Sequence, residues 1–424
     1  MDPKALLTAS FNAAVSAADP FQILPASLPR PPKGKTVVVG AGKAAASMAL
    51  AVEQHWPAEA PLSGLVITRY QHGLLTNRIK VIEAGHPVPD ESGETAAREI
   101  LRLARSLGKD DLLLVLVSGG GSSLLSLPVQ AITMDELKTT TRELLRCGAP
   151  IQDMNTVRKH LSLIQGGRLA AACKAEVLAL VISDVTGDNP THIASGPCSP
   201  DPSTYQDALD IFARFGVNAP ATVTAHLERG ARGEVAETPK PGNKAFERVS
   251  TKLIATAQQS LRAAAVFFEQ HHIPAVVLGD SVTGEAAEVA KVYAALTRQI
   301  QTHAAPFKAP VALISGGECT VTLRGKGRGG RCTEFLLSLA IELDGMPDTW
   351  ALAADTDGID GSEDNAGAVL SPDALARAEK LGISAKKLLA NNDGYGFYER
   401  LGDLIVTGPT RTNINDYRVI LINR

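Results

Sequence analysis

The stretch Lys35-Thr-Val-Val-Val-Gly-Ala-Gly-Lys-Ala-Ala-Ala46 places a run of β-branched residues directly before two glycines and a series of alanines. β-Branched residues favour strands, and alanine is the strongest helix former. Glycine permits the sharp turn between two such elements. The stretch therefore predicts a strand, a tight turn and a helix, which is the opening unit of an α/β fold.

The same rhythm repeats along the chain. Short apolar runs end near Gly, Ser or Asp, and segments rich in Ala and Leu lie between most of them. This alternation is typical of α/β units around a largely parallel sheet. The expected strands are 36–39, 64–68, 112–117 and 177–183 in the first half, and 252–257, 275–278, 311–315, 350–354 and 417–422 in the second.

The chain of 424 residues is long enough for two hydrophobic cores, because single cores stop growing at roughly 250 to 300 residues. Between residues 218 and 247, three prolines stand among Gly, Glu, Lys and Arg with little apolar periodicity. Such composition is typical of a linker. We therefore expect two domains, at 1–235 and 236–424.

Composition also excludes several classes of protein. The net charge is -3, and Lys and Arg are not gathered in runs, so a nucleic-acid partner is not expected. No apolar run approaches the roughly 20 residues that span a bilayer, and no signal peptide is visible, so we expect a cytoplasmic protein without a membrane partner. The five cysteines are far apart, which favours reduced, structural thiols.

The turn Gly40-Ala-Gly-Lys-Ala-Ala45 has the spacing of a dinucleotide-binding fingerprint. The acidic residue that should follow about 20 positions later is missing, and Arg69 stands there instead, where it could meet the 2′-phosphate of NADP. Alternatively, Lys43 beside glycine amides would attract a phosphorylated ligand. A third possibility is that the glycines only permit the turn.

Three further strand ends carry groups suited to anions and cations. Ser118, Gly119, Gly120, Gly121, Ser122 and Ser123 form a loop whose backbone amides could wrap a phosphate or a carboxylate. Paired carboxylates follow two other strands, Asp184 with Asp188 and Asp355 with Asp357. They suit Mg²⁺ or proton abstraction from a hydroxyl, although aspartate is also common in ordinary turns.

The segment 324–331 alternates glycines with four cations and leads into an amphipathic helix. Arginine clamps phosphate and carboxylate oxygens with its planar fork, so Arg331 and Arg328 are candidate anion-binding residues. A solvated basic loop is the alternative.

Taken together, these motifs resemble the glycerate 2-kinase family with a MOFRL C-terminal domain, some members of which are labelled hydroxypyruvate reductase. The resemblance spans nearly the whole chain. It rests on nine segments in the same order: 39–44, 84–90, 118–124, 183–188, 195–197, 315–318, 329–331, 355–361 and 407–416. One departure is Cys332-Thr333, where the family usually has Asn-Gln.

The resemblance implies a Rossmann-like N-terminal domain, a smaller mixed α/β C-terminal domain and an active site in the cleft between them. It implies ATP-dependent, Mg²⁺-assisted phosphorylation of D-glycerate at its 2-hydroxyl. Lys43 would neutralise the transferring phosphoryl group, Asp184 or Asp188 would orient the hydroxyl or hold Mg²⁺, and Arg331 would grip an anion. The remaining expected ligand contacts are the loop 118–123, Glu318, Arg328 and Asn413 for substrate or nucleotide, and Asp188, Asp355 and Asp357 for the metal.

Two competing functions stay open at this point. An NADPH-dependent hydroxypyruvate reductase would use the first glycine turn and Arg69 but not the loops of the second half. A non-catalytic sensor of a phosphorylated metabolite would use the anion loops but not the paired carboxylates. The sequence also leaves open the nucleotide preference and whether the chain forms a homodimer.

Overall fold

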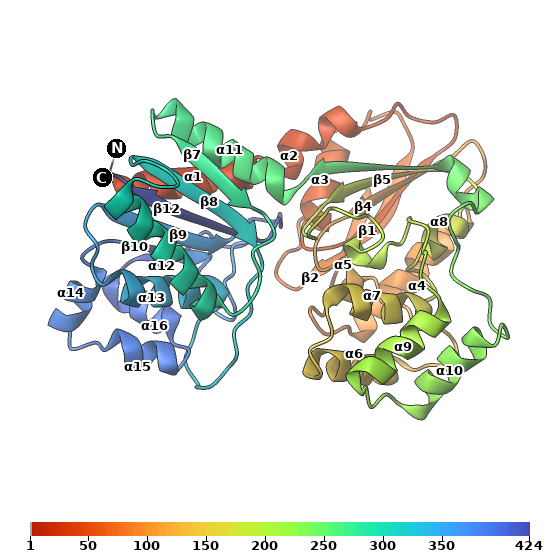
Figure 1. Cartoon of the computed structure of the whole chain (residues 1–424). Helices are drawn as coiled ribbons and strands as arrows, with labels where there is room; N and C mark the ends of the chain where they lie inside the picture. Colours follow the sequence, from red (N-terminus) through yellow and green to blue (C-terminus); the bar gives the residue numbers. More distant parts are fainter. Residues whose placement is uncertain (1) are drawn as a thin grey trace. The chain divides into compact units, whose positions relative to one another are not determined.

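The computed structural model describes residues 2–424 and divides the chain into two compact units (Figure 1). We call Pro20–Ile254 the parallel-sheet unit. We call Ala255–Arg424, together with the segment that ends at Asp19, the mixed-sheet unit. Each unit has its own six-stranded sheet, so the predicted fold class is confirmed: a unit with a largely parallel sheet and a second, mixed α/β unit.

The sheet of the parallel-sheet unit has the strand order β3-β2-β1-β4-β5-β6. The first five strands in this order are parallel, and Ala41 of β1 pairs with Val117 of β4. The order reverses direction between β1 and β4, which is where α/β proteins usually bind ligands. The strands are β1 Thr36–Ala41, β2 Leu62–Arg69, β3 Ile79–Ala84, β4 Leu112–Val117, β5 Glu176–Ile182 and β6 Val249–Ala255.

Helices cover both faces of this sheet because its strands are apolar on both sides. Helix α3 (Ala45–His55) contacts β1, β2 and β3, and α4 (Glu91–Arg105) contacts the same three strands. Asp90 accepts a hydrogen bond from Gly93 N–H and thereby caps the start of α4. The shorter helices of the unit are α2 Pro20–Ile23, α5 Gly121–Leu124 and α8 Arg168–Ala171.

Four amphipathic helices form a second apolar core beside the sheet, which the strand pattern of the sequence did not predict. Thr133 and Glu136 make a capping box at the start of α6, and Thr204 and Asp207 make another at α9. Leu144, Val157 and other apolar side chains of these helices pack on one another. The four helices are α6 Met134–Arg146, α7 Ile151–His160, α9 Tyr205–Phe215 and α10 Ala221–Ala231.

The mixed-sheet unit has the strand order β11-β10-β9-β12-β8-β7. Only the β7–β8 pair is parallel among the described pairs; the others are antiparallel. The strands are β7 Ala275–Gly279, β8 Val311–Gly317, β9 Thr349–Asp355, β10 Gly367–Leu370, β11 Leu404–Ile405 and β12 Asp416–Ile422. The central strand β12 is buried throughout, as expected for a strand covered by helices on both faces.

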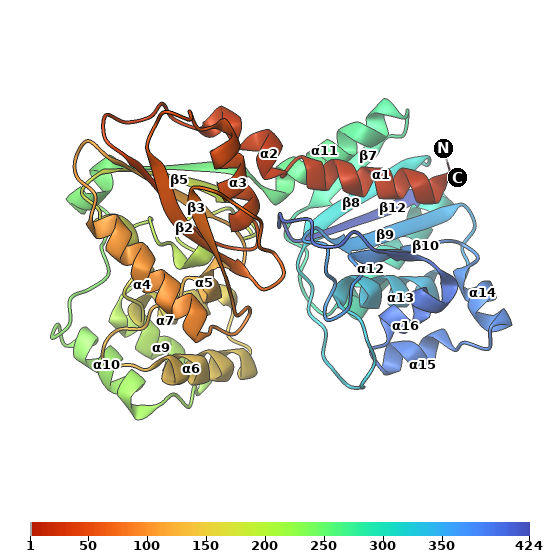
Figure 2. The ribbon, with the colours of Figure 1, turned by 180° about the vertical axis from the view of Figure 1, so that it is seen from behind.

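Figure 2 shows α1 lying along one face of this mixed sheet. Helices α1 (Pro3–Ser16) and α11 (Ala257–Gln270) form the apolar layer on that face, which includes the fully buried Phe11 and Phe268. The other helices are α12 Ala286–His303, α13 Arg331–Leu343, α14 Ala374–Lys380, α15 Ala385–Ala390 and α16 Gly394–Leu401; the apolar core on the opposite face is built largely from α12 and α13.

These units differ from the predicted division at residue 235. The polar segment from residue 218 onward contains α10 and then leads into β6, which adds an edge strand to the parallel sheet. The chain passes to the mixed-sheet unit only after Ile254. The N-terminal helix also joins that unit, because its apolar face with Leu7 and Phe11 packs on α11 and the mixed sheet.

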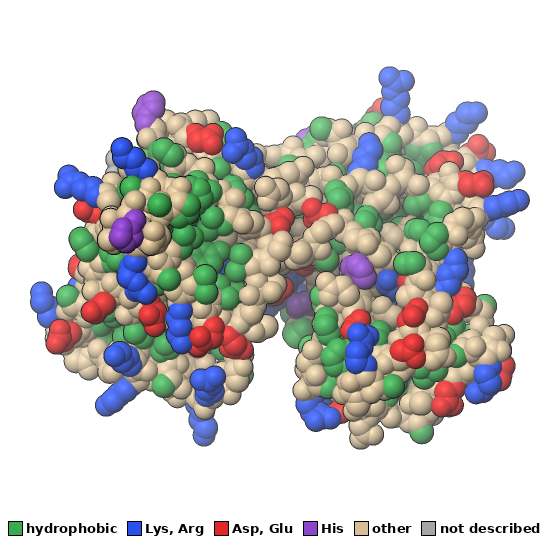
Figure 3. Space-filling view, viewed as in Figure 1, with side chains coloured by type: hydrophobic (Ala, Val, Ile, Leu, Met, Phe, Trp, Pro, Cys, Tyr) green, Lys and Arg blue, Asp and Glu red, His purple; other side chains and the backbone are tan. Residues whose placement is uncertain are grey.

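On the face of the protein shown in Figure 3, basic and acidic side chains are interspersed rather than gathered by sign. None of the helices in residues 2–424 is long and apolar enough to cross a bilayer.

Candidate functional site

The turn between β1 and α3 uses its own backbone amides within the protein. Gly42 N–H donates to the carbonyl of Ile67 at 3.0 Å, and Lys43 N–H donates to the carbonyl of Gly119 at 2.8 Å. Ala44 N–H donates to Ser118 Oγ at 3.0 Å. A dinucleotide fingerprint needs such amides at the start of the helix for the pyrophosphate. The turn therefore serves to join two loops rather than to cradle a dinucleotide.

The glycines of this turn are required by the close approach of β4 and the loop that follows it. A Cβ on Gly40 would lie 2.0 Å from the Leu116 carbonyl oxygen. A Cβ on Gly42, where φ is +143°, would lie 2.1 Å from Ser118 Oγ and 2.5 Å from the Ser118 carbonyl oxygen. Only a residue without a side chain fits at either place.

Gly42→Ala is therefore expected to lower the free energy of unfolding of the parallel-sheet unit by about 1–3 kcal/mol through overpacking, in addition to its backbone strain. Gly233→Ala is the matched control, because Gly233 also has a positive φ (+76°) but no atom within 4 Å of its Cβ position. Urea unfolding in a Trp350→Phe background, followed by the fluorescence of Trp56, measures both variants. Equal losses in the two variants would show that the turn is not closely packed.

The turn places Lys43 beside the glycine loop that follows β4. A Cβ on Gly120 would lie 3.5 Å from Cγ of Lys43 and 2.8 Å from Nε2 of His86. Burial, together with the positive charge of Lys43, lowers the pKa of His86 to about 3, so its imidazole is neutral near pH 7. Lys43 is thus the cation beside the glycine loop, with Arg69 and Arg158 as further positive charges near His86, which is a neutral neighbour.

The loop 118–123 keeps donors that the first turn lacks. In the described residues 2–424, no acceptor faces the N–H groups of Gly119 and Gly120, whereas Ser118 N–H donates to Ala41 and Gly121 N–H donates to Ser118. Gly119 is buried, so its donor requires a partner that this chain does not supply. Two such donors beside a lysine suit an anion.

Ser122 is fixed by a short chain of hydrogen bonds. Its Oγ lies 2.9 Å from Ser195 Oγ, which lies 3.0 Å from Asn155 Oδ1. Ala194 and Ser195 both have left-handed backbone conformations, with φ of 50° and 56°. Such conformations cost about 1–3 kcal/mol each and are concentrated at functional sites.

Asp184 and Asp188 follow β5, the strand next to β4, and both are partly buried. Asp188 has a left-handed backbone (φ 51°) and its N–H donates to the Val185 carbonyl at 3.0 Å. The sequence prediction thus places Lys43, the loop 118–123 and both carboxylates at the carboxyl ends of three adjacent parallel strands, and the structure brings them to that edge.

In the mixed-sheet unit, Arg331 at the start of α13 is held by carboxylates. Its Nε donates to Asp416 at 2.8 Å and its terminal nitrogen donates to Asp355 at 2.7 Å; Glu318 lies 3.4 Å away. Although burial disfavours the cation, Asp416 and Asp355 hold the pKa of Arg331 above its ordinary value. Asp416 also binds Arg418, so two arginines and two carboxylates form a cluster in which only Arg331 is partly exposed.

The basic loop before α13 differs from the expected anion-binding loop in its backbone. The N–H groups of Arg324 and Gly325 both donate to Asn392 Oδ1, at 2.7 and 3.0 Å. Arg328 N–H donates to Asp393, while its guanidinium pairs with Glu399 at 2.6 Å and lies over the ring of Tyr395. The glycines of this loop therefore permit close packing on the turn 391–393, and Arg328 belongs to a surface ion pair.

The departure at Cys332-Thr333 has a structural explanation. Cys332 is fully buried in the apolar core. Thr333 Oγ1 donates to Asp360 at 2.9 Å, and the same carboxylate accepts the N–H groups of Cys332 and Thr333. Asp360 thus caps the buried start of α13. Burial raises the pKa of Asp360 to about 6.

The other predicted residues of this unit are engaged locally. Asp357 Oδ1 accepts the Ile359 N–H at 2.8 Å, and Asp355 Oδ1 accepts the Asp357 N–H at 3.0 Å. Asn413 is buried, and its Oδ1 accepts the Asn415 N–H at 3.3 Å. Glu318 is more than half exposed.

The described residues contain no group of three or more His, Cys, Asp and Glu side chains arranged to hold a metal ion. Mg²⁺ needs fewer, because one or two carboxylates suffice when water and phosphate complete its shell. Asp184 and Asp188 fit that requirement. The unengaged N–H groups of Gly119 and Gly120 beside Lys43 fit the phosphates of a nucleotide.

The sequence patterns did not single out three residues of this region: His86, Ser195 and Arg158, whose positive charge lies near His86 and helps to lower the pKa of that imidazole. His86 and Ser195 lie in motifs that carry the family resemblance. Arg158 stands in Arg-Lys-His at the end of α7, where cations are expected for the helix dipole alone. No signal in the sequence separates it from such ordinary cations.

Comparison with known proteins identifies the family of the chain. The model of a family described as a domain of unknown function (DUF4147) matches residues 6–228, and the MOFRL family model matches residues 311–416. An Agrobacterium vitis protein, provisionally named hydroxypyruvate reductase, is 48% identical over 97% of this chain and 93% of its own length. A Pyrococcus horikoshii protein named glycerate 2-kinase is 39% identical over 92% of this chain and 88% of its own.

A crystal structure of glycerate kinase from Thermotoga maritima superposes with a TM-score of 0.87, at 36% identity, over 99% of each chain. Sequence and fold are thus shared over nearly the full length of both molecules. The chain belongs to the glycerate 2-kinase family, in which a DUF4147 domain is joined to a MOFRL domain.

Proposed function

We propose that this protein is a D-glycerate 2-kinase that uses ATP and Mg²⁺. In the reaction the 2-hydroxyl oxygen of D-glycerate forms a bond to the γ-phosphorus, the bond from that phosphorus to ADP breaks, and the hydroxyl proton is released. The observation that carries the proposal is Lys43 beside the unengaged amides of Gly119 and Gly120, in a chain whose relatives are named glycerate kinases.

The roles of the residues follow from charge and place. Lys43 and the two amides would stabilise the charge of the transferring phosphoryl group, which is the main task of a protein in such reactions. Asp184 or Asp188 would accept the hydroxyl proton or hold Mg²⁺. When bound, Mg²⁺ supplies further neutralisation of the phosphate charge.

A hydroxypyruvate reductase is the second candidate, because a relative at 48% identity carries that name. The structure gives it little support. The amides that would bind a pyrophosphate in the β1–α3 turn already donate to Ile67, Gly119 and Ser118.

Parallel assays separate the two functions. One follows ADP release from ATP and Mg²⁺ with D-glycerate, and the other follows oxidation of NADPH or NADH with hydroxypyruvate. We expect ADP release that depends on D-glycerate and no oxidation of either cofactor. Cofactor oxidation without ADP release would reject the kinase.

A further inference from the structure

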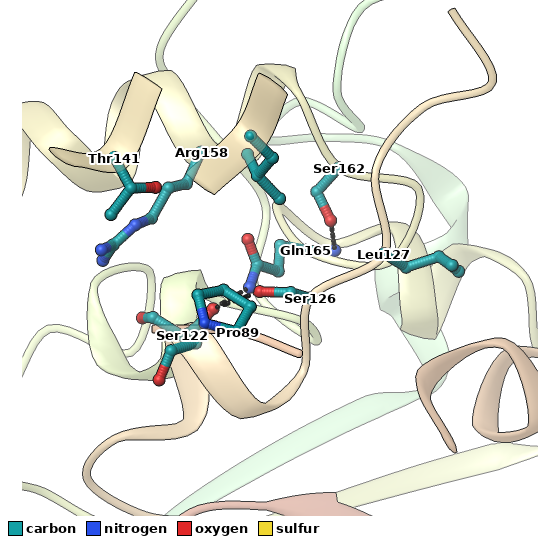
Figure 4. A pocket seen from close by; sticks show the side chains of 10 residues that line it. Pro89, Ser122, Ser126, Leu127, Thr141, Arg158, Ser162 and Gln165 are labelled. Atoms are coloured by element: carbon teal, nitrogen blue, oxygen red, sulfur yellow. Dashed lines mark hydrogen bonds between the residues drawn. The ribbon is translucent and has the colours of Figure 1, made fainter. Parts of the chain in front are cut away.

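A small polar pocket lies in the parallel-sheet unit between α5, α6 and α7, and none of the roles above uses it. Its enclosed part is about 10 Å³, room for about one water molecule, and the empty space at its mouth, open solvent included, is about 300 Å³. Figure 4 shows Arg158 extending from α7 on the same side of the pocket as Thr141, with Ser122 and Pro89 near them. Gln165 closes another side and donates to the Ser122 carbonyl at 2.8 Å.

Arg158 brings a positive charge into this pocket that no carboxylate of the described chain balances. Its only hydrogen bond within residues 2–424 goes to Asn155 Oδ1 at 3.3 Å, and no ion pair includes it. Two other charged side chains of α7 do have partners of opposite charge: Asp153 pairs with Arg214, and Lys159 pairs with Asp201.

Burial lowers the pKa of Arg158 to about 10. The guanidinium therefore remains charged near pH 7, but in a poorly solvated place. A partly buried cation without a carboxylate partner is unfavourable unless an anion binds beside it. Arginine binds carboxylates in a paired geometry, so a carboxylate is a fitting ligand.

Ser122 adds a group that recognises a hydroxyl. Asn155 directs its amide nitrogen to the His192 carbonyl at 3.0 Å, so its Oδ1 faces Ser195 and Arg158. Because Oδ1 only accepts, the single proton of Ser195 goes to it. Ser122 then donates to Ser195, and the remaining lone pairs of Ser122 Oγ can accept a hydrogen bond from a ligand hydroxyl.

We propose that Arg158 and Ser122 form the substrate subsite, in which Arg158 binds the carboxylate of a small 2-hydroxy acid and Ser122 Oγ accepts a hydrogen bond from a ligand hydroxyl other than the one that receives the phosphoryl group. The inference rests on the proposed kinase function for the identity of the acid. The loop 118–123 connects the proposed phosphate site with the proposed substrate subsite. Gly120 lies beside the side chain of Lys43, and Ser122 lines the same pocket as Arg158.

The test is titration calorimetry of D-glycerate into the purified protein without nucleotide, so that binding is measured apart from turnover. Arg158→Ala is expected to weaken binding about 10- to 100-fold, the range for one hydrogen bond to a charged group. D-Glyceramide, which lacks the carboxylate charge, should bind the wild type more weakly than D-glycerate does, and the variant should bind both alike.

Arg105→Ala is the matched control, because Arg105 is exposed at the end of α4 and does not line the pocket. Arg158→Gln, which keeps a donor for Asn155, replaces the alanine variant if that one fails to fold, as judged by Trp56 fluorescence. Unchanged affinity for D-glycerate in a folded Arg158 variant would overturn the proposal, and so would the absence of binding to the wild type. Arg158-dependent binding without phosphorylation would reject the kinase and keep the subsite.

Discussion

Lys43→Ala is expected to lower kcat for D-glycerate phosphorylation at least about 100-fold, because loss of one group that stabilises transition-state charge typically costs that much. The structure gives the reason. The backbone of Lys43 is fixed by its N–H bond to Gly119 and by the Thr68 hydroxyl on its carbonyl oxygen. Its stem passes Gly120, beside amides without acceptors in residues 2–424. Steady-state kinetics with saturating ATP and D-glycerate measure the effect.

Lys80→Ala is the matched control, since Lys80 is an exposed lysine on β3 of the same unit. It should leave kcat unchanged. The glycerate affinity of Lys43→Ala should change far less than its kcat, because the substrate carboxylate is assigned to Arg158. An unchanged kcat in Lys43→Ala would remove this lysine from the mechanism.

Asp416→Asn should lower the free energy of unfolding of the mixed-sheet unit by about 3–5 kcal/mol, the cost of breaking a buried ion pair by removing one partner. Asp416 is 1% exposed and binds both Arg331 and Arg418. Without its charge, Asp355 is the one deeply buried carboxylate left in the cluster to balance two arginines.

Trp350 reports this change, because its strand β9 pairs with β12, which begins at Asp416. The chain has only two tryptophans, so Trp56→Phe makes Trp350 the sole fluorescent indole. Urea unfolding of Asp416→Asn in that background measures the loss, and Glu379→Gln on the exposed face of α14 serves as control. A loss no greater than that of the control would mean that the cluster contributes nothing net to stability.

Much of the fold could be predicted from local pattern. The strands β1, β4 and β5 are continuous apolar runs that end in glycine, serine or aspartate, and the structure has them at the expected places. Strand β3 was missed because Lys80 and Glu83 break its apolar run. The position of α1 on the mixed sheet could not be predicted, since it depends on packing against α11, far away in sequence.

For the candidate site, the sequence patterns could not show which glycines and cations face a ligand. A glycine indicates that something approaches the backbone closely, but not whether this is a ligand or another part of the chain. At Gly40 and Gly42 the neighbour is Leu116 and Ser118, and at Gly325 it is Asn391. Arg158 shows the converse, because only the three-dimensional arrangement reveals that a common helix-end cation has no carboxylate partner among residues 2–424.

The most direct test of the central claim is phosphorus NMR of the products formed from D-glycerate, ATP and Mg²⁺ by the wild-type protein. We predict the resonances of ADP and 2-phosphoglycerate in equal amounts, and neither product with Lys43→Ala on the same timescale. A 3-phosphoglycerate resonance would contradict the assigned position of transfer. ATP left intact with active wild-type protein, while NADPH is oxidised by hydroxypyruvate, would contradict the kinase itself.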